Sequence, residues 1–126
     1  MAASGSFRAF VLEQLGRVVE RVRGRSMFGG VGIYASDVFF ALIADDVLYL
    51  KVDALNRPEF EARGRVPFRP LGERGETMQY YPLPDDVLDD VEALRPWVEK
   101  AIAAAGRKRR RPPARRGKGG ADAARS

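Results

Sequence analysis

The chain of 126 residues contains neither cysteine nor histidine. This absence excludes disulfides, thiol catalysis, Ser–His and Cys–His triads, and zinc sites built from these ligands. No apolar run approaches the roughly 18 residues that a membrane span requires. Residues 1–6 lack the basic and apolar regions of a secretory signal. These absences predict a cytoplasmic protein with no membrane association, no metal and no cofactor, and they disfavour an enzyme.

The overall net charge of +5 conceals a separation of charge along the chain. Residues 1–106 carry 13 Lys and Arg against 16 Asp and Glu, a net charge of −3, whereas residues 107–126 carry nine cations and one Asp, a net charge of +8. The second segment has no Leu, Ile, Val or aromatic residue and cannot offset its ordering entropy by burial. We therefore expect one domain over residues 1–106 and a disordered basic tail over residues 107–126.

The first half of the domain changes from a helical to a strand pattern. Between residues 6 and 23, apolar residues recur at spacings of three or four, with Ser6 as the expected N-cap and Gly24 as the expected stop. Runs of β-branched and aromatic residues follow at 38–44 and 47–52, after a glycine-rich stretch that leads to Tyr34. These runs predict a three-stranded meander whose tight turns place Asp37 and Asp46 at positive φ.

The second half alternates in the same way. We expect a helix over about 54–63, capped by Asp53 and stopped by Gly64, with Leu55 and Phe60 directed inward. Strands are expected at 66–69 and 78–81, joined by a polar turn at 71–76, and residues 83–90 are expected to be irregular or a single turn. A last helix over 96–105 would carry Pro96 in its first turn and stop at Gly106. The resulting layout is α-β(3)-α-β(2)-α, an α+β fold of two layers in which helices cover one antiparallel sheet.

Several separated motifs resemble the TfoX/Sxy family and match its N-terminal domain over residues 6–105. The resemblance lies in residues 25–34 (RSMFGGVGIY), 40–43, 48–53, 60–62, 67–68, 78–81 and 94–97. The family motif positions are Met27, Phe28, Gly29, Gly30, Gly32, Tyr34, Lys51, Tyr80, Tyr81, Pro96 and Trp97. We interpret these positions as structural.

The resemblance implies the same α-β(3)-α-β(2)-α layout, similar to secretion-chaperone-like folds, and a role in transcription regulation. Proteins of this family activate natural competence genes as coactivators of the cAMP receptor protein. The full-length regulators carry a second, helical domain at the C-terminus, where this chain has its basic segment instead. Secretion-chaperone-like folds often pair, so a homodimer is expected only by analogy.

Two motifs in the domain have both a functional and a structural interpretation. Gly29, Gly30 and Gly32 could cradle a phosphate, but they precede a strand and no Lys-Ser/Thr follows, so a sharp turn from the first helix into the sheet is favoured. Five acidic residues could bind Mg²⁺ or Ca²⁺, but their spacing fits no calcium loop, so a solvated acidic turn that caps the following helices is favoured. A docking patch for a basic partner, or for the basic tail of the protein itself, is the other interpretation. These residues are Asp85, Asp86, Asp89, Asp90 and Glu92.

The strands raise a third possibility. Aromatic residues on a sheet face could stack on nucleic-acid bases, although such a face should also carry cations. The candidate strands 32–35, 38–44, 47–52 and 78–81 contain one cation, Lys51. The aromatic residues are Tyr34, Phe39, Phe40, Tyr49, Tyr80 and Tyr81. Packing between sheet and helices is the favoured interpretation. Lys51 lies on the same strand face as Tyr49, and whether that face meets solvent or core stays open.

The basic segment carries the strongest functional signal. Flexible cations neutralise phosphates and release counterions, which gives affinity without sequence preference. The expected phosphate-binding residues are Arg107, Lys108, Arg109, Arg110, Arg111, Arg115, Arg116 and Lys118. We therefore predict an accessory, DNA-associated transcription regulator whose domain binds a protein partner such as a transcription factor. The alternative is a protein-interaction or small-ligand module in which the segment only increases solubility.

Overall fold

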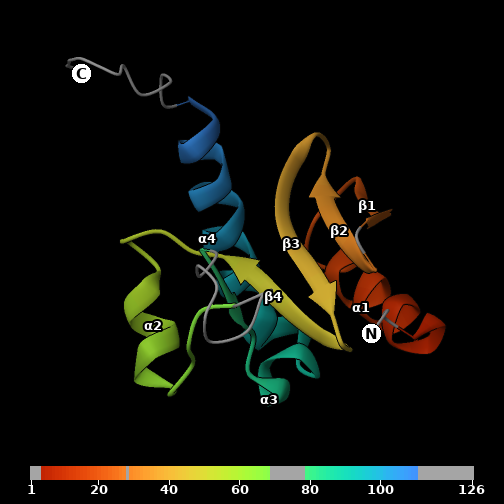
Figure 1. The fold of residues 1–126 in the computed structure, drawn as a ribbon, viewed down its shortest axis with the longest axis horizontal. Helices are drawn as coiled ribbons and strands as arrows, with labels where there is room; N and C mark the ends of the chain where they lie inside the picture. The colour runs from red at the N-terminus through yellow and green to blue at the C-terminus, as the bar shows by residue number, and fades with distance from the viewer. Residues whose placement is uncertain (1–3, 28, 69–78, 111–126) are drawn as a thin grey trace.

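The computed structural model describes residues 4–27, 29–68 and 79–110, and they form an α+β fold of two layers (Figure 1). The strands are β1 (Val22–Met27), β2 (Gly30–Ala35), β3 (Val38–Ala44), β4 (Val47–Lys51) and β5 (Tyr80–Pro82). They pair antiparallel in the order β1-β2-β3-β4-β5. The helices are α1 (Gly5–Gly16), α2 (Arg57–Ala62), α3 (Asp85–Leu88) and α4 (Val91–Arg110). The expected fold class is confirmed, although the observed order has four strands before α2.

The first helix is shorter than the apolar pattern predicts. It ends at Gly16 rather than near residue 23, and the hydroxyl of Ser4, not Ser6, accepts the capping hydrogen bond from the backbone of Phe7. After a bend with Arg21 at φ 61°, residues 22–27 form β1. Gly24, the expected stop, pairs with Ile33 inside the sheet. The expected helix to residue 23 is wrong because strand pairing with β2 prevails over the helical spacing of Val18 and Val22.

The two central hairpins are confirmed, and their turns differ in detail from expectation. Asp46 has φ 58°, as predicted, and Asp45 has φ 52°. In the turn between β2 and β3, Ser36 rather than Asp37 has the positive φ, at 55°. The pairing register shifts between Ile33 and Tyr34, which leaves β3 with one extra residue opposite them. This bulge sets which aromatic side chains meet across the two strands.

The segment after β4 forms a shorter helix than expected. Helix α2 spans Arg57–Ala62, with Pro58 in its first turn. Phe60 is buried as predicted, whereas Leu55 is 71% exposed, so its predicted inward position is wrong. Gly64 ends the helix with φ 74°, as predicted. Residues 66–68 form no strand, although the backbone N–H of Phe68 donates to the carbonyl oxygen of Tyr80. The expected strand at 78–81 is found as β5, and the polar turn at 71–76 lies outside the described residues.

The last helix is longer at both ends than the predicted 96–105. It begins at Val91, where the carboxylate of Asp90 accepts hydrogen bonds from the backbone of Glu92 and Ala93. Pro96 therefore lies inside α4 rather than in its first turn. The helix continues past Gly106 to Arg110, so the expected stop at Gly106 is wrong. The single turn expected between residues 83 and 90 is α3.

The core lies between one face of the sheet and the helices. It joins Val11 and Leu15 of α1, Phe60 of α2, and Leu94 and Val98 of α4 to the strands. The strand residues that share it include Val31, Ile33, Ala41, Ile43, Leu48, Leu50 and Tyr81. At the base of this layer, the side-chain amide of the buried Gln14 donates to the carbonyl oxygen of Leu88 at 2.9 Å. All four described helices thus pack on the same side of the sheet.

Candidate nucleic-acid interface

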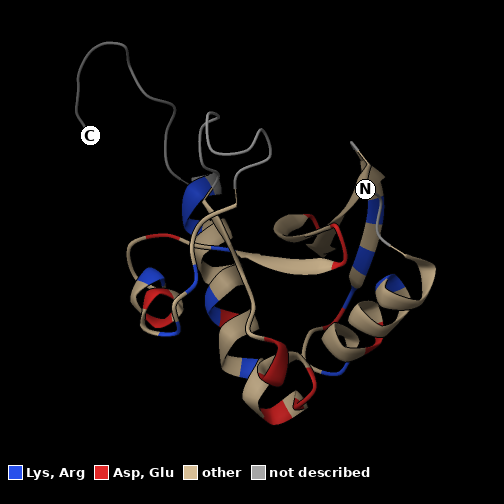
Figure 2. Ribbon diagram, turned by 60° about the horizontal axis from the view of Figure 1, so that its bottom comes forward, with Lys and Arg blue, Asp and Glu red and all other residues tan. Residues whose placement is uncertain are grey.

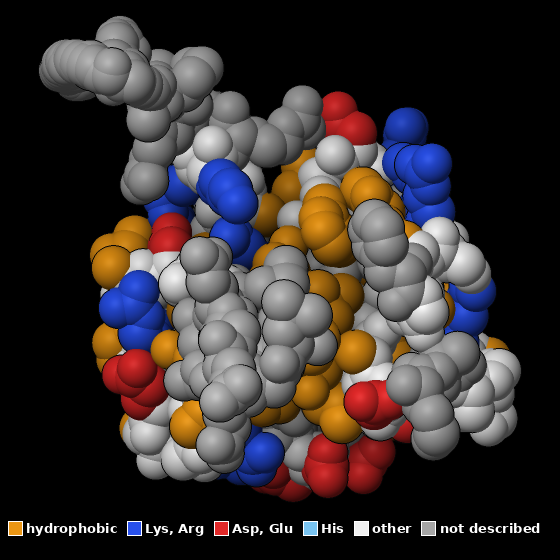
Figure 3. Space-filling view, in the orientation of Figure 1, with side chains coloured by type: hydrophobic (Ala, Val, Ile, Leu, Met, Phe, Trp, Pro, Cys, Tyr) orange, Lys and Arg blue, Asp and Glu red, His pale blue; other side chains and the backbone are white. Residues whose placement is uncertain are grey.

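The face of the sheet opposite the four described helices, called the helix-free face below, carries a row of aromatic rings. Tyr34 of β2 stacks on Phe39 of β3 with ring centroids 5.1 Å apart, and Phe39 lies 5.7 Å from the ring of Tyr80 on β5. Tyr34 and Phe39 are partly exposed, whereas Tyr80 is buried. Figure 3 looks onto this face, where hydrophobic side chains gather over the middle of the sheet. We call Tyr34, Phe39 and Tyr80 the aromatic row.

A cation lies against each end of the aromatic row. The guanidinium carbon of Arg23 lies 4.7 Å from the centroid of the Tyr34 ring, and the Lys51 ammonium lies 5.2 Å from that of Tyr80. Both distances fall within the range of a cation–π interaction. Arg23 comes from β1, a strand missed by the sequence reasoning. The alternation of Arg21, Arg23 and Arg25 with Val22 and Gly24 could have indicated it, since alternate residues of a strand share one face.

The electrostatic character of this face therefore differs from the sequence-based interpretation, in which Lys51 was the only cation. The five described strands contain three cations, Arg23, Arg25 and Lys51, and no Asp or Glu. The preferred interpretation, in which these rings pack between the sheet and the helices, holds for Tyr81, which contacts Phe60. It is wrong for Tyr34, Phe39 and Tyr80, since the described helices pack on the opposite face.

Lys51 is a cation of the site whose pKa is lowered. Its side chain is 5% exposed, and it lies beside the aromatic row on the last residue of β4. Burial and the nearby charge of Lys108 lower the pKa of the Lys51 ammonium to about 8, and the charge of Asp53 opposes them only in part. Strand β4 thus places the Lys51 side chain on the helix-free face, beside the Tyr80 ring. The Lys108 ammonium, at the end of α4, is close enough for its charge to act on the Lys51 ammonium.

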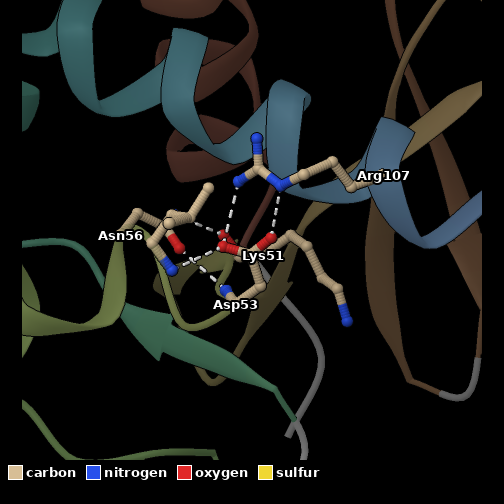
Figure 4. A network of polar contacts seen from close by, with 5 residues as sticks. Lys51, Asp53, Asn56 and Arg107 are labelled. Atoms are coloured by element: carbon tan, nitrogen blue, oxygen red, sulfur yellow. Dashed lines mark hydrogen bonds and ion pairs between the residues drawn. The ribbon is translucent and has the colours of Figure 1, made fainter.

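A polar network fixes the end of α4 beside β4 (Figure 4). The Nε of Arg107 donates to Asp53 Oδ2 at 2.7 Å, and its Nη2 donates to Oδ1 at 3.0 Å. The backbone of Leu55 also donates to the Asp53 carboxylate, and the backbone N–H of Asp53 donates to Asn56 Oδ1. The hydrogen bond from Arg107 lowers the pKa of the Asp53 carboxyl. Asp53, the expected helix cap, instead joins two segments 54 residues apart.

This network alters the expected set of phosphate-binding residues. Arg107 is paired with Asp53 and belongs to α4, so its assignment to a free tail is wrong. Lys108 is exposed. Arg109 and Arg110 complete the helix, and the remaining predicted residues lie outside the described part of the chain. These are Arg111, Arg115, Arg116 and Lys118.

The family of the chain follows from its sequence. The family model of the TfoX N-terminal domain matches residues 13–105. The chain belongs to the TfoX N-terminal domain family. No curated protein matches the chain. The match of this TfoX domain ends before Arg107, so it leaves out the last turn of α4 and the basic segment that follows.

The motif residues of the TfoX domain fall into two groups. Tyr34, Lys51 and Tyr80 meet on the helix-free face, and the side chain of Met27 lies against Gly32 there. On the core side, Tyr81 and Trp97 contact Phe60, with ring centroids 5.6 and 4.8 Å away. Phe28 is outside the described residues.

The glycines of the TfoX domain serve a hairpin rather than the expected turn from helix to sheet. Gly29 lies between β1 and β2 with φ 79°. A Cβ at Gly30 would lie 2.4 Å from the carbonyl oxygen of Ile43. Both positions require glycine for a structural reason, which accounts for the motif without a bound phosphate.

The acidic cluster lies at α3 and at the start of α4 (Figure 2). Asp90 caps α4, and Asp86 forms an ion pair with Arg63 at 2.7 Å. Within the described residues, no group of three or more acidic side chains is placed to hold a metal ion. The capping interpretation is therefore confirmed for Asp90. None of the described helices is long and apolar enough to cross a membrane.

Proposed function

We propose that the protein is an accessory, DNA-associated regulator of transcription. In this proposal, the TfoX domain binds a protein partner, such as a transcription factor, and the basic C-terminal segment contacts phosphates. The family to which the chain belongs supports the regulatory role, and the separation of charge supports the phosphate contacts. A domain of net charge −3 would itself be repelled by DNA, so the +8 carried by residues 107–126 must supply the attraction.

The single observation that carries this proposal is that α4 continues into the run of cations. Four consecutive cations, Arg107 to Arg110, form the last turn of α4. Cations are stabilised at this end of a helix by its macrodipole. Arg107 is bound to Asp53 and holds the turn in place, which makes it a positioning residue rather than a phosphate contact. The other seven predicted cations, from Lys108 onward, constitute the proposed phosphate-binding set.

The proposal is tested by duplex DNA binding measured against salt concentration. A shortened chain should end after Arg110, because this keeps α4 and the Arg107–Asp53 pair intact. A matched variant of full length replaces Arg111, Arg115, Arg116 and Lys118 with Gln. For about five phosphates neutralised, the logarithm of affinity should fall with the logarithm of salt at a slope near −4.5. Removing one of these cation–phosphate interactions should make the slope shallower by about 0.9.

Both altered chains should bind duplex DNA more weakly and with a shallower salt dependence than the full chain. Unchanged affinity and slope in both would refute the role of the basic segment. If the full chain instead retains one acidic protein and no nucleic acid at ~0.15 M salt, the protein-interaction alternative gains support and DNA association is rejected.

A further inference from the structure

We propose that the helix-free face of the sheet binds a short stretch of single-stranded nucleic acid, with bases against Tyr34 and Phe39 and a phosphate between Lys51 and Lys108. This inference rests on the proposed function, which names nucleic acid as the ligand. It adds that the bound nucleic acid is single-stranded, and it names the residues that bind it. Three of the four residues of this site are borne by strands, and only Lys108 also belongs to the basic segment.

The aromatic row provides the stacking platform. Tyr34 and Phe39 are partly exposed neighbours whose rings are inclined by 26°, so they present adjoining π-surfaces. Bases stack on such rings without sequence preference, since every base has a π-face. In a duplex, by contrast, the base faces are occupied by neighbouring bases. An aromatic platform therefore favours single strands.

The charges around the row match a phosphate backbone. Arg23 lies at the Tyr34 end and Lys51 at the Tyr80 end, and the described strands contribute no carboxylate. Of the acidic residues near Lys51, Asp53 is already engaged in two hydrogen bonds with Arg107. Its negative charge is therefore shared between Arg107 and Lys51, and among the described strands no carboxylate adds to it.

The pair of lysines indicates where a phosphate would lie. An anion placed beside a buried ammonium group stabilises its charged form. Burial already disfavours the charged form of Lys51, and the charge of Lys108 adds to this effect. A phosphate at this position would oppose both effects and stabilise the Lys51 ammonium. The Tyr80 ring links the two parts of the site, since it contacts both Lys51 and Phe39.

Among the described residues, the rings of Tyr34, Phe39 and Tyr80 make ring–ring contacts only with one another. The described helices all pack on the opposite face, where Phe60 contacts Tyr81 and Trp97. On the helix-free face, Phe68 covers Tyr49, with ring centroids 4.6 Å apart, and it is not among the ring partners of the aromatic row. Tyr34 and Phe39 are thus partly exposed rings that the described core does not use, and Tyr80 lies buried beside Phe39.

The test measures fluorescence anisotropy of labelled (dT)₁₀ and (U)₁₀ and of a ten-base-pair duplex with the full chain. Phe39→Leu and Tyr34→Leu keep an apolar side chain and remove the ring. Each should weaken single-strand binding about fivefold to 150-fold, as expected for the loss of stacking on one base. Duplex binding should change by less than about twofold. Comparing the two oligonucleotides distinguishes DNA from RNA as the single strand.

Phe10→Leu is the matched control, because Phe10 is an exposed aromatic residue on α1 outside the aromatic row. It should leave single-strand binding unchanged. Lys108→Gln tests the phosphate position at an exposed residue, where folding is not at risk. It should reduce the salt slope for single strands by about 0.7, whereas Lys100→Gln, elsewhere on α4, should not. Thermal unfolding followed by circular dichroism establishes that each variant is folded.

The outcomes separate this inference from the proposed function. If duplex and single strands bind equally and the ring substitutions have no effect, the inference is overturned and the basic segment remains the binding element. Loss of single-strand binding in the ring variants, with no duplex binding by the full chain, supports the inference and rejects the duplex role. Binding of neither ligand rejects both.

Discussion

Phe60 provides the sharpest test of how the short helix α2 is held to the domain. The helix has only six residues, so its stability must come from packing rather than from its own hydrogen bonds. Phe60 is 1% exposed, and its ring lies edge-on to Trp97 at 4.8 Å and 5.6 Å from the ring of Tyr81. We therefore expect substitutions of Phe60 to be costly and those of its exposed neighbour Leu55 to be neutral.

The magnitude follows from the two ring pairs. Phe60→Leu keeps an apolar side chain but removes both aromatic pairs, each worth about 0.5–1.5 kcal/mol. The free energy of unfolding should therefore fall by about 1–3 kcal/mol. For a domain of about 100 residues, this corresponds to a decrease in Tm of about 4–8 °C per kcal/mol. Phe60→Ala should cost about 3–5 kcal/mol, because it also leaves a cavity.

Urea unfolding followed by Trp97 fluorescence is the appropriate assay, since Trp97 is the only tryptophan and contacts Phe60 directly. Leu55→Ala is the matched control and should change the free energy of unfolding by less than about 0.5 kcal/mol. The reasoning is refuted if Phe60→Leu and Leu55→Ala have the same effect. Equal effects would mean that α2 contributes no packing to the core.

Two further predictions concern Lys51 and the glycines. An unfolded lysine has a pKa near 10.4, whereas that of Lys51 is about 8, so the unfolded chain binds more protons and stability should rise from pH about 8 toward 10. Urea unfolding across this range should show the rise in the natural chain and a weaker one in Lys51→Met; parallel pH profiles would contradict the lowered pKa. Gly30→Ala should lower stability by about 1–3 kcal/mol, because its Cβ would lie 2.4 Å from the carbonyl oxygen of Ile43. Gly16→Ala, with no atom within 4 Å of the added Cβ, should raise stability by about 0.5 kcal/mol in the same assay; destabilisation by both would contradict the steric argument.

Sequence patterns predicted the elements whose residues carry a strong local signal. The runs at 38–44 and 47–52 are rich in β-branched and aromatic residues, and they form β3 and β4 almost as expected. The helix was predicted to extend to residue 23 because the spacing of Val18 and Val22 continues the helical pattern of α1. The choice between helix and strand there depended on pairing with β2, which a local pattern does not contain.

The candidate site was harder to predict because it depends on contacts between distant segments. The length of α4 could not be read from Gly106, since Arg107 is held by Asp53, 54 residues earlier in the chain. The aromatic row depends on the register shift between Ile33 and Tyr34, which brings Tyr34 opposite Phe39. Its cationic end depends on Arg23, in a segment expected to be helical. Composition identified the aromatic residues, but only the topology placed them together.

The two outermost strands of the described sheet bear on whether a second copy of the chain could extend it. A free strand edge invites another chain to continue the sheet. On one side, β1 has Arg23 and Arg25 exposed, so a second copy aligned there would meet like charges. On the other side, β5 has only three residues, includes Pro82, which has no N–H to donate, and already accepts a hydrogen bond from Phe68 at Tyr80. Edge-to-edge aggregation is therefore opposed by repulsion at one margin of the sheet and by missing or occupied hydrogen-bonding groups at the other.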